Sequence, residues 1–266
     1  MRNRVWSRRF PAKAADPAAV SPPRARPTLF LIGDSTVRNR TRGQLGWGEP
    51  IAGLFDQSKI TVTNRALGGR SSRTFLTEGL WDKVLAELKP GDFVLIQFGH
   101  NDGGELAKGD RPRASLKGNS DETKDVAVER TGKPETVHTF GWYMRQYARE
   151  AKAKAVTPIL CSLVPRKIWK NGKVARGNES HGQWTAEAAR AEGVAFLDLN
   201  EIIARRYEAL GAEKVETLFA DQHTHTTPAG AELNAASVIA GLKGLSTNPL
   251  APFFSEKART VTAYVE

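Results

Sequence analysis

The sequence predicts an α/β fold built on a parallel sheet with helices on both faces. Five short segments are apolar or β-branched almost throughout and are bounded by glycine, proline or charged residues, as is typical of strands buried on both sides. Segments with helical periodicity lie between them, and strands that alternate with helices favour a doubly wound parallel sheet. The expected strands are residues 28–32 (TLFLI), 60–64 (ITVTN), 93–98 (FVLIQF), 159–163 (ILCSL) and 194–197 (VAFL).

The intervening helices are predicted from apolar residues spaced i, i+3 and i+4. They cover residues 81–88, 137–153, 183–191, 201–210 and 228–242. The last begins at Pro228, a residue that is favoured in the first helical turn. In doubly wound sheets the functional groups lie beyond the carboxyl ends of the strands, so the segments that follow the strands are where a site is expected.

Length and composition fit one globular domain with two flanking segments. The 266 residues are 40% apolar and 26% charged, which is typical of a soluble globular protein, and no run approaches the ~20 apolar residues that span a membrane. We expect a disordered, basic, Ala/Pro-rich tail over residues 1–26, a domain over 27–245 and a C-terminal extension over 246–266. The single cysteine, Cys161, excludes an internal disulfide and a cysteine-rich metal site.

The positive charge is concentrated in the tail. Residues 1–26 hold seven basic residues and one acid, and so supply six of the ten net positive charges of the chain. The remainder is only mildly basic, and we expect neither nucleic acid nor a membrane as partner. An Arg-Arg pair in the tail lacks the apolar segment that an export signal requires. A long polar stretch, residues 103–134, is expected to be a loop beside the site.

Ser35 is the candidate nucleophile. It follows the first expected strand at once, and Gly33 lets the chain turn sharply out of that strand. A place at a helix N-terminus would point backbone N–H groups at charge that develops during a reaction. A serine hydroxyl needs a neighbouring base to become a nucleophile. The alternative role for Ser35 is to cap a helix.

The candidate base lies in residues 221–225 (DQHTH). This is the only segment in which an acid and two histidines occur within about one turn. A histidine held by a carboxylate is the usual base for a serine nucleophile. The alternatives are a surface pair or a hydrogen bond in the core.

Hydrogen-bond donors follow the second and third expected strands. Gly69 can offer a backbone N–H without a Cβ in the way, and Asn101 can offer its side-chain NH₂. Together with the N–H of Ser35 they would form an oxyanion hole. The alternative for each is a turn residue, and Asp34 and Asp102 are expected to hold turns rather than to take part in chemistry.

These blocks, in this order, resemble the SGNH hydrolase superfamily, also called GDSL esterases, and within it the rhamnogalacturonan acetylesterases of carbohydrate esterase family twelve. The resemblance covers roughly residues 28–243. It rests on residues 32–37 (IGDSTV), 64–75 (NRALGGRSSRTF), 98–104 (FGHNDGG), 136–142 (TVHTFGW) and 223–236 (HTHTTPAGAELNAA).

The resemblance implies a flavodoxin-like three-layer α/β/α sandwich with a mostly parallel five-stranded sheet, and a serine mechanism that needs no metal or cofactor. It makes Ser35 the nucleophile, Gly69 and Asn101 donors of the oxyanion hole, His225 the base and Asp221 its orienting acid. The family usually spaces this acid and base three residues apart, whereas Asp221 and His225 are four apart. Either a one-residue bulge absorbs the difference, or His225 leans on a backbone carbonyl or another acid. His223 is the alternative base.

The resemblance also implies an acetylated, acidic polysaccharide or oligosaccharide as substrate, and therefore a secreted or periplasmic protein. Arg70 and Arg73, beside Gly69, are the expected carboxylate-binding residues. The loop after the fourth strand is also basic, and either it helps to bind the polymer, with Trp169 stacking on a sugar, or it is simply solvated. Its cations are Arg166, Lys167, Lys170, Lys173 and Arg176.

Three alternatives remain open at the level of sequence. The same site could act on another acyl ester, such as acetyl-xylan, a thioester or a lysophospholipid. The chain could be a carbohydrate-binding relative without activity, although all the chemical groups are retained. A nucleotide-binding flavodoxin-like domain would need a glycine-rich phosphate loop with a lysine, which the sequence lacks.

Overall fold

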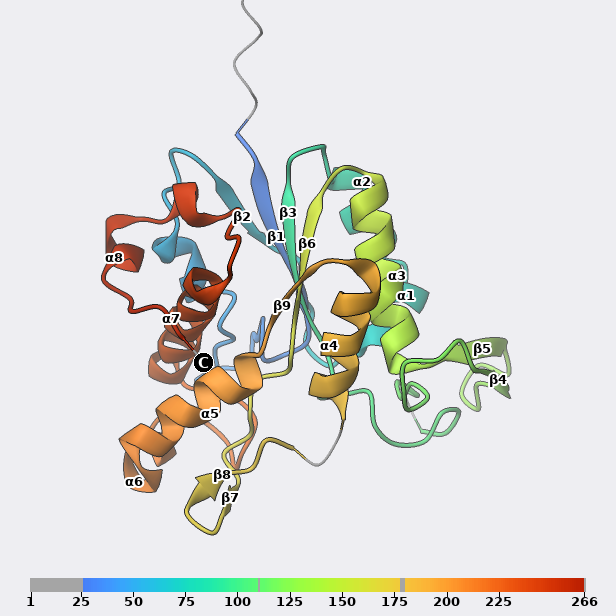
Figure 1. The fold of residues 1–266 in the computed structure, drawn as a ribbon. Helices are drawn as coiled ribbons and strands as arrows, with labels where there is room; N and C mark the ends of the chain where they lie inside the picture. Colours follow the sequence, from blue (N-terminus) through green and yellow to red (C-terminus); the bar gives the residue numbers. More distant parts are fainter. Residues whose placement is uncertain (1–25, 110, 178–179, 266) are drawn as a thin grey trace, which may run out of the picture.

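The central element of the fold is a five-stranded parallel sheet (Figure 1). A computed structural model describes residues 26–109, 111–177 and 180–265, so the tail predicted for residues 1–26 lies outside the described residues except at its last position. The strand order is β2-β1-β3-β6-β9, and every neighbouring pair is parallel. Each strand lies within two residues of its predicted position. The strands are β1 (Thr28–Gly33), β2 (Thr61–Asn64), β3 (Phe93–Gln97), β6 (Thr157–Cys161) and β9 (Ala195–Leu197).

Alternation of side chains along the strands divides the core into two layers. Leu29 and Leu31 of β1 belong to one buried cluster, whereas Phe30 and Ile32 belong to the other. Because successive side chains of a strand point to opposite faces, each face of the sheet needs its own cover of helices. The predicted flavodoxin-like three-layer α/β/α sandwich is confirmed.

The helices divide between the two faces (Figure 1). One face carries α1 (Ser72–Thr77), α2 (Leu80–Glu87), α3 (Phe140–Ala153) and α4 (His181–Glu192). The other carries α5 (Leu199–Leu210), α6 (Ala212–Glu216), α7 (Pro228–Gly244), α8 (Glu256–Arg259) and the 3-10 turns η1 (Pro50–Leu54) and η2 (Ala251–Phe253). The residues after 245 pack on this second face, where Leu250, Phe254 and Ala258 are buried in its cluster.

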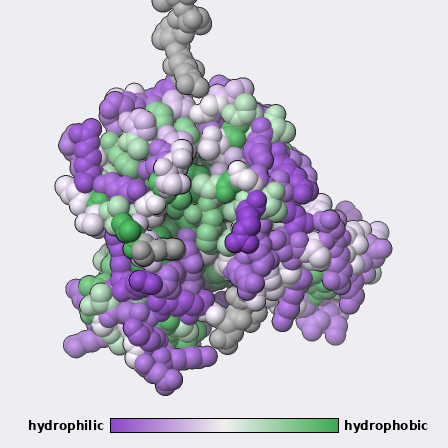
Figure 2. All heavy atoms as spheres, viewed as in Figure 1, coloured by the Kyte–Doolittle hydropathy of each residue, from purple (hydrophilic) through white to green (hydrophobic). Residues whose placement is uncertain are grey.

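Two hairpins project from the sandwich, and neither was predicted (Figure 1). They are formed by β4 (Thr123–Ala127) with β5 (Pro134–His138), and by β7 (Trp169–Lys170) with β8 (Lys173–Val174). Figure 2 shows that both are covered mainly by hydrophilic side chains, which explains why no alternation marked them as strands. The helix expected from residue 137 begins instead at Phe140, because the hydroxyl of Thr139 caps it by accepting from the Trp142 N–H at 3.2 Å.

Two buried arginines fasten the long polar stretch to the domain. Arg73 donates to the carbonyls of Leu106 and Ala114, both at 2.8 Å. Arg145 of α3 binds Asn119 and also pairs with Asp121 at 2.6 Å. The stretch is therefore attached through polar contacts to its backbone and side chains, in keeping with its polar sequence. Within the described part of the chain, no helix combines the length and the apolar character that crossing a membrane requires.

Candidate active site

Ser35 lies in a tight turn directly after β1. Asp34 is fully buried, and its Oδ1 accepts from the N–H and the hydroxyl of Thr36, both at 2.8 Å, so it holds the turn as expected. Gly33 is required here, because a Cβ at that position would lie 2.5 Å from the carbonyl oxygen of Gln97. The turn presents the half-buried Ser35 side chain at the carboxyl edge of the sheet.

The expected helix after Ser35 is absent. The chain instead forms a turn in which the N–H of Arg38 donates to the Asp34 carbonyl at 3.0 Å. It then folds back, so that the N–H of Trp47 donates to Thr36 O at 3.0 Å. The prediction of a helix N-terminus at this position was therefore wrong, and the helix dipole does not contribute to the site. Individual backbone N–H groups of the turn remain available as hydrogen-bond donors at the site.

His225 and Asp221 complete a hydrogen-bonded chain with Ser35. The Oγ of Ser35 lies 2.9 Å from Nε2 of His225, and Nδ1 of His225 lies 2.5 Å from Oδ2 of Asp221. The structure thus brings together the nucleophile, base and acid proposed from the sequence, from positions 190 residues apart. His223 instead points its Nδ1 at the hydroxyl of Thr224, 2.6 Å away, and the hydrogen bond of the Ser35 hydroxyl among the described residues is to His225.

The four-residue spacing works because Asp221 uses its two oxygens for different tasks. Oδ1 accepts from the backbone N–H groups of His223, Thr224 and His225 at 3.1, 2.7 and 2.9 Å. These bonds wrap the loop around the carboxylate and leave Oδ2 for the His225 ring. The extra residue is therefore absorbed by a compact turn around Asp221, which is the bulge expected as one of the alternatives.

Hydrogen bonding to Asp221 also fixes the protonation pattern of the site. Burial would raise the pKa of Asp221, but the N–H groups of His225 and Thr224 and the His225 ring outweigh it and lower the pKa to about 2. An ionised Asp221 can only accept, so Nδ1 of His225 must carry a proton. In the neutral imidazole, Nε2 is then the lone-pair nitrogen that faces the hydroxyl of Ser35.

Gly69 and Asn101 face the same cavity as Ser35. The cavity has a volume of about 570 Å³, and its lining includes Ser35, Gly69, Asn101 and His225. Gly69 has a φ of +77°, a left-handed conformation that favours glycine. The side-chain nitrogen of Asn101 donates one hydrogen to the Arg70 carbonyl at 2.9 Å, which orients the amide and leaves its second hydrogen free.

Asp102 positions the segment that carries Asn101. Its buried carboxylate accepts from the N–H and hydroxyl of Ser72, at 3.1 and 2.5 Å, and from the hydroxyl of Ser115 at 3.3 Å. Burial raises the pKa of Asp102 to about 7, although the bonds from Ser72 and Ser115 act in the opposite direction. Asp102 thereby joins β3, the start of α1 and the polar stretch, in agreement with the structural role expected for it.

Arg70 and Arg73, which we expected to bind substrate, both carry out structural tasks. Arg73 is fully buried, and its guanidinium pairs with Glu135 at 2.6 Å as well as with two carbonyls. This burial removes Arg73 from any surface that a polysaccharide could touch. Arg70 is only 19% exposed and pairs with Glu78 at 2.9 Å. Position next to Gly69 in the sequence did not reveal that Arg73 is buried, whereas a role for the partly exposed Arg70 in substrate binding stays a prediction.

Three arginines that the sequence analysis did not single out line the catalytic cavity instead. They are Arg38, Arg40 and Arg113, and Nη1 of Arg113 donates to the carbonyl of Gly69 at 3.3 Å. Arg113 comes from the long polar stretch, so only the fold brings it to the site. Proximity of that stretch to the site was expected, but nothing in its sequence distinguishes Arg113 from its neighbours.

Comparison with known proteins points to one family. The family model described as the GDSL-like Lipase/Acylhydrolase family matches residues 31–233. The rhamnogalacturonan acetylesterase of Emericella nidulans is 34% identical over 80% of this chain and 83% of its own length. A probable rhamnogalacturonan acetylesterase of Bacillus subtilis, YesY, is 33% identical over 82% of this chain and 93% of its own length.

Solved structures are similar in fold. The Bacillus subtilis protein YxiM has a TM-score of 0.66 at 27% identity, over 82% of this chain and 56% of its own. A variant of Axe2, an acetyl-xylooligosaccharide esterase from Geobacillus stearothermophilus, has a TM-score of 0.54 at 19% identity, over 80% of this chain and 92% of its own. At that identity the second likeness shows the fold alone.

Proposed function

The chain belongs to the GDSL-like lipase/acylhydrolase family and is a carboxylic ester hydrolase, and from this premise we propose that it removes O-acetyl groups from a pectic polysaccharide of the rhamnogalacturonan type. The observation that carries the proposal is the continuous chain from Ser35 through His225 to Asp221, in a sequence whose relatives at 33–34% identity are named for this activity. Because the proposed substrate is a polymer of this kind, the same proposal has the enzyme act outside the cytoplasm.

In the proposed cycle, the hydroxyl of Ser35 gives its proton to Nε2 of His225 as Oγ attacks the acetyl carbonyl. The carbonyl π electrons move to oxygen, and the N–H groups of Ser35 and Gly69 with the amide of Asn101 receive that oxyanion. The C–O bond to the sugar then breaks, and the sugar oxygen takes the proton from His225. The products of this half are a free sugar hydroxyl and an acetyl-serine.

The second half repeats the chemistry with water. His225 takes a proton from the water while the water oxygen attacks the carbonyl carbon of the acetyl-serine. When acetate leaves, Oγ of Ser35 takes this proton back from His225. Asp221 remains ionised throughout, because its pKa of about 2 lies far below neutrality, and so it stabilises the imidazolium each time it forms.

The catalytic cavity favours a short acyl group on a polar alcohol. Of the described residues that line it, only Leu67 is aliphatic, and the rest are polar, charged or glycine. A long acyl chain of a lysophospholipid or thioester would lie against these polar groups with little apolar surface to bury it. Acetylated xylan is the remaining alternative within the same chemistry.

Acetate release from acetylated rhamnogalacturonan, homogalacturonan and xylan tests the proposal. We expect kcat/KM to be highest on rhamnogalacturonan, and we expect Ser35→Ala to abolish release from all three polymers. A higher kcat/KM on xylan would assign the enzyme to that polymer instead. Faster hydrolysis of 4-nitrophenyl octanoate than of 4-nitrophenyl acetate would overturn the assignment as an acetylesterase.

A further inference from the structure

The oxyanion donor Gly69 lies in a tight turn beside the nucleophile. The N–H of Arg70 donates to the carbonyl of Leu67 at 3.3 Å, which closes a four-residue turn with Gly68 and Gly69 at its centre. A Cβ built on Gly68 would lie 3.5 Å from the Cβ of Ser35, so the turn approaches the nucleophile closely. The N–H of Gly69 belongs to the peptide between the two glycines, and the orientation of this central peptide decides where that N–H points.

A turn with two central glycines can hold its central peptide in two orientations. Gly69 has a φ of +77°, whereas the φ of Gly68 lies outside the left-handed region, which is the pattern of a type II turn. A type I turn joins the same end residues with the central peptide reversed and a negative φ at the third position. Glycine adopts either sign of φ readily, so the backbone alone selects neither form strongly. Reversal would direct the Gly69 N–H away from the catalytic cavity.

Arg70 binds the carbonyl of this same central peptide. Its Nη1 donates to the oxygen of Gly68 at 3.1 Å, and its Nε donates to Oε2 of Glu78, at the end of α1, at 2.9 Å. The carbonyl and the N–H of a planar trans peptide point in opposite directions. The bond to Gly68 therefore holds the Gly69 N–H on the side away from the guanidinium. Within the described part of the chain, that N–H makes no hydrogen bond of its own.

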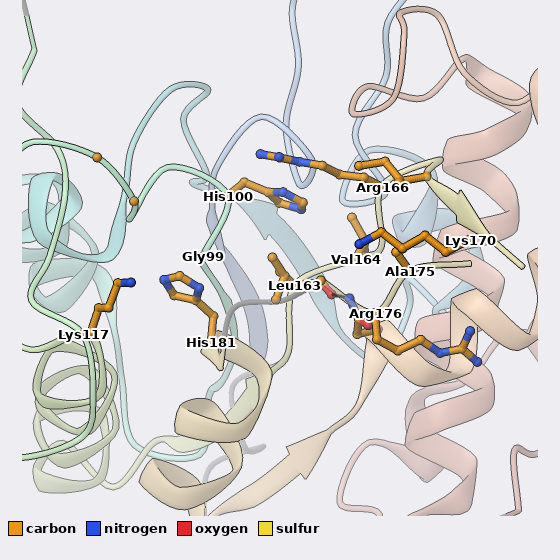
Figure 3. Close-up of a pocket in the computed structure, with 15 residues that line it drawn as sticks. Gly99, His100, Lys117, Leu163, Val164, Arg166, Lys170, Ala175, Arg176 and His181 are labelled. Atoms are coloured by element: carbon orange, nitrogen blue, oxygen red, sulfur yellow. Dashed lines mark hydrogen bonds between the residues drawn. The ribbon is translucent and has the colours of Figure 1, made fainter. Parts of the chain in front are cut away.

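Arg70 lines neither of the two cavities at the site. Gly68 and Gly69 line the catalytic cavity, and Arg70 is absent from the described residues around it. A neighbouring cavity of about 520 Å³ has His100 and Arg166 in its wall (Figure 3), and the described residues that line it do not include Arg70 either. The carbonyl end of the central peptide thus faces Arg70, outside the catalytic cavity, and the N–H end faces into it.

Side chains also hold the next two carbonyls of the turn. Nη1 of Arg113 donates to the carbonyl of Gly69 at 3.3 Å, and the amide of Asn101 donates to the carbonyl of Arg70 at 2.9 Å. These two bonds fix the end of the turn, but the central peptide can reverse without breaking either of them. The bond from Arg70 to the Gly68 oxygen is therefore the one that selects between the two orientations.

We propose that Arg70 is a positioning residue of the oxyanion hole, which keeps the Gly68–Gly69 peptide in the orientation that directs the Gly69 N–H at the oxyanion. A cationic donor on the carbonyl also polarises the peptide and strengthens its N–H as a donor. The effect is largest when the acetyl carbonyl takes up negative charge. This inference rests on the proposed reaction cycle, but not on which polymer carries the acetyl group.

The test uses Arg70→Met, which keeps an apolar stem but removes every donor to the Gly68 oxygen. The measured quantities are kcat and KM for 4-nitrophenyl acetate. We expect kcat to fall about tenfold or more, toward the factor of about 10² that loss of a whole oxyanion donor costs, while KM stays within about twofold of wild type. The acidic limb of the plot of kcat against pH should not move, because the base and its acid are unaltered.

A double-mutant cycle with Gly69→Ala tests the reversal itself. Alanine disfavours a φ of +77° and so favours the reversed peptide. Because both changes then act on one peptide, the double variant should be little slower than the slower single variant. Losses in kcat that multiply would overturn the reversal.

Arg65→Met is the matched control. Arg65 lies close to the turn in the sequence, but its described side-chain hydrogen bonds both go to Glu87. We expect its kcat to equal that of the wild type. An equal loss in Arg65→Met and Arg70→Met would show a nonspecific effect of charge and would overturn the positioning role.

The outcomes separate the two proposals. If Ser35→Ala hydrolyses 4-nitrophenyl acetate as fast as the wild type, the proposed cycle is wrong and the role of Arg70 is withdrawn with it. If Ser35→Ala is inactive but Arg70→Met keeps the wild-type kcat, the cycle stands and only the positioning role is overturned. A higher KM with an unchanged kcat also overturns it, and would make Arg70 a substrate-binding residue.

Glu78→Ala keeps the test decisive if Arg70→Met does not fold, as judged from the melting temperature. This change removes the carboxylate that anchors the Arg70 side chain, and leaves the guanidinium free to move away from the Gly68 oxygen. We expect kcat to fall by a smaller factor than in Arg70→Met, again without a change in KM. A wild-type kcat in Glu78→Ala would then count as the refutation.

Discussion

Replacing Asp221 with asparagine should inactivate the enzyme while leaving the loop folded. An asparagine can keep its carbonyl oxygen where Oδ1 of Asp221 accepts three backbone N–H groups. Its NH₂ group would then face Nδ1 of His225, where Oδ2 now lies at 2.5 Å. Nδ1 would have to accept, so the imidazole proton would move to Nε2, and the base would lose the lone pair that it needs.

The hydrogen bonds of the loop disfavour the opposite orientation of the asparagine amide, which would otherwise restore an acceptor for Nδ1 of His225. Turning the asparagine round would direct its NH₂ at three N–H donors, and each unmade bond costs ~1 kcal/mol or more. A total of ~3 kcal/mol keeps the flipped form below about 1% of molecules. The corresponding change in serine proteases lowers kcat about 10⁴-fold, and we expect a loss of 10³–10⁴-fold here.

The assay is the kcat for 4-nitrophenyl acetate, measured together with the melting temperature of each variant. Asp221→Asn should melt close to wild type, whereas Asp221→Ala removes the acceptor of all three N–H groups and should melt lower. An Asp221→Asn enzyme that retained more than a tenth of the wild-type kcat would refute this reasoning, because it would show that His225 does not depend on Asp221 for its tautomer.

Three further predictions concern stability and the oxyanion hole. Burial keeps Asp102 protonated up to a pKa of about 7 in the folded protein but not in the unfolded chain, so the stability it contributes should fall as the pH rises from about 4 to 7. Asp102→Asn should flatten this part of a plot of melting temperature against pH, and an unchanged slope would contradict the assignment. Gly69→Ala should lower kcat at least tenfold, because it disturbs an oxyanion donor held at a φ of +77°. Gly211→Ala, at a φ of +81° between α5 and α6, should impose similar backbone strain without lowering kcat, and equal losses in the two variants would count against a catalytic role for Gly69. Arg73→Ala leaves Glu135 and two carbonyls without their partner and should cost about 3–5 kcal/mol, seen as a melting temperature lower by about 10 °C, whereas a near-native value would show that the buried pair contributes little.

The sheet and the nucleophile could be predicted because their signals are local. Each strand is a short apolar run, and the order of strands and helices determines which loops meet at one edge of the sheet. Ser35, Gly69 and Asn101 lie in the loops that follow β1, β2 and β3, and for this reason their placement in one cavity could be foreseen. The β4–β5 hairpin could not, because most of its side chains are polar and the few apolar ones, such as Val126 and Val137, give no alternating pattern.

The arginines show where prediction from sequence fails. Whether an arginine can bind a substrate anion or instead stabilises the fold depends on which carboxylates of the protein lie near it. Those carboxylates come from distant positions in the sequence. Arg70 finds Glu78 within its own segment, but Arg73 finds Glu135 across 62 residues. The helix expected after Ser35 was wrong for a similar reason, because residues 46–48 fold back against the turn and their backbone takes the hydrogen bonds that a helix would have used.

The way the long polar stretch is attached sets a limit on the working temperature of the enzyme. None of the described residues between 103 and 134 belongs to either core cluster, so this stretch can detach without breaking the core on either face of the sheet. Detachment would release Asp102 from Ser115 and disorder the support of Asn101 while the helices remain intact. Heat should therefore abolish activity before the helical circular dichroism signal changes, and thermal resistance would be gained by strengthening the anchorage at Arg73 and Arg145 rather than by repacking the interior.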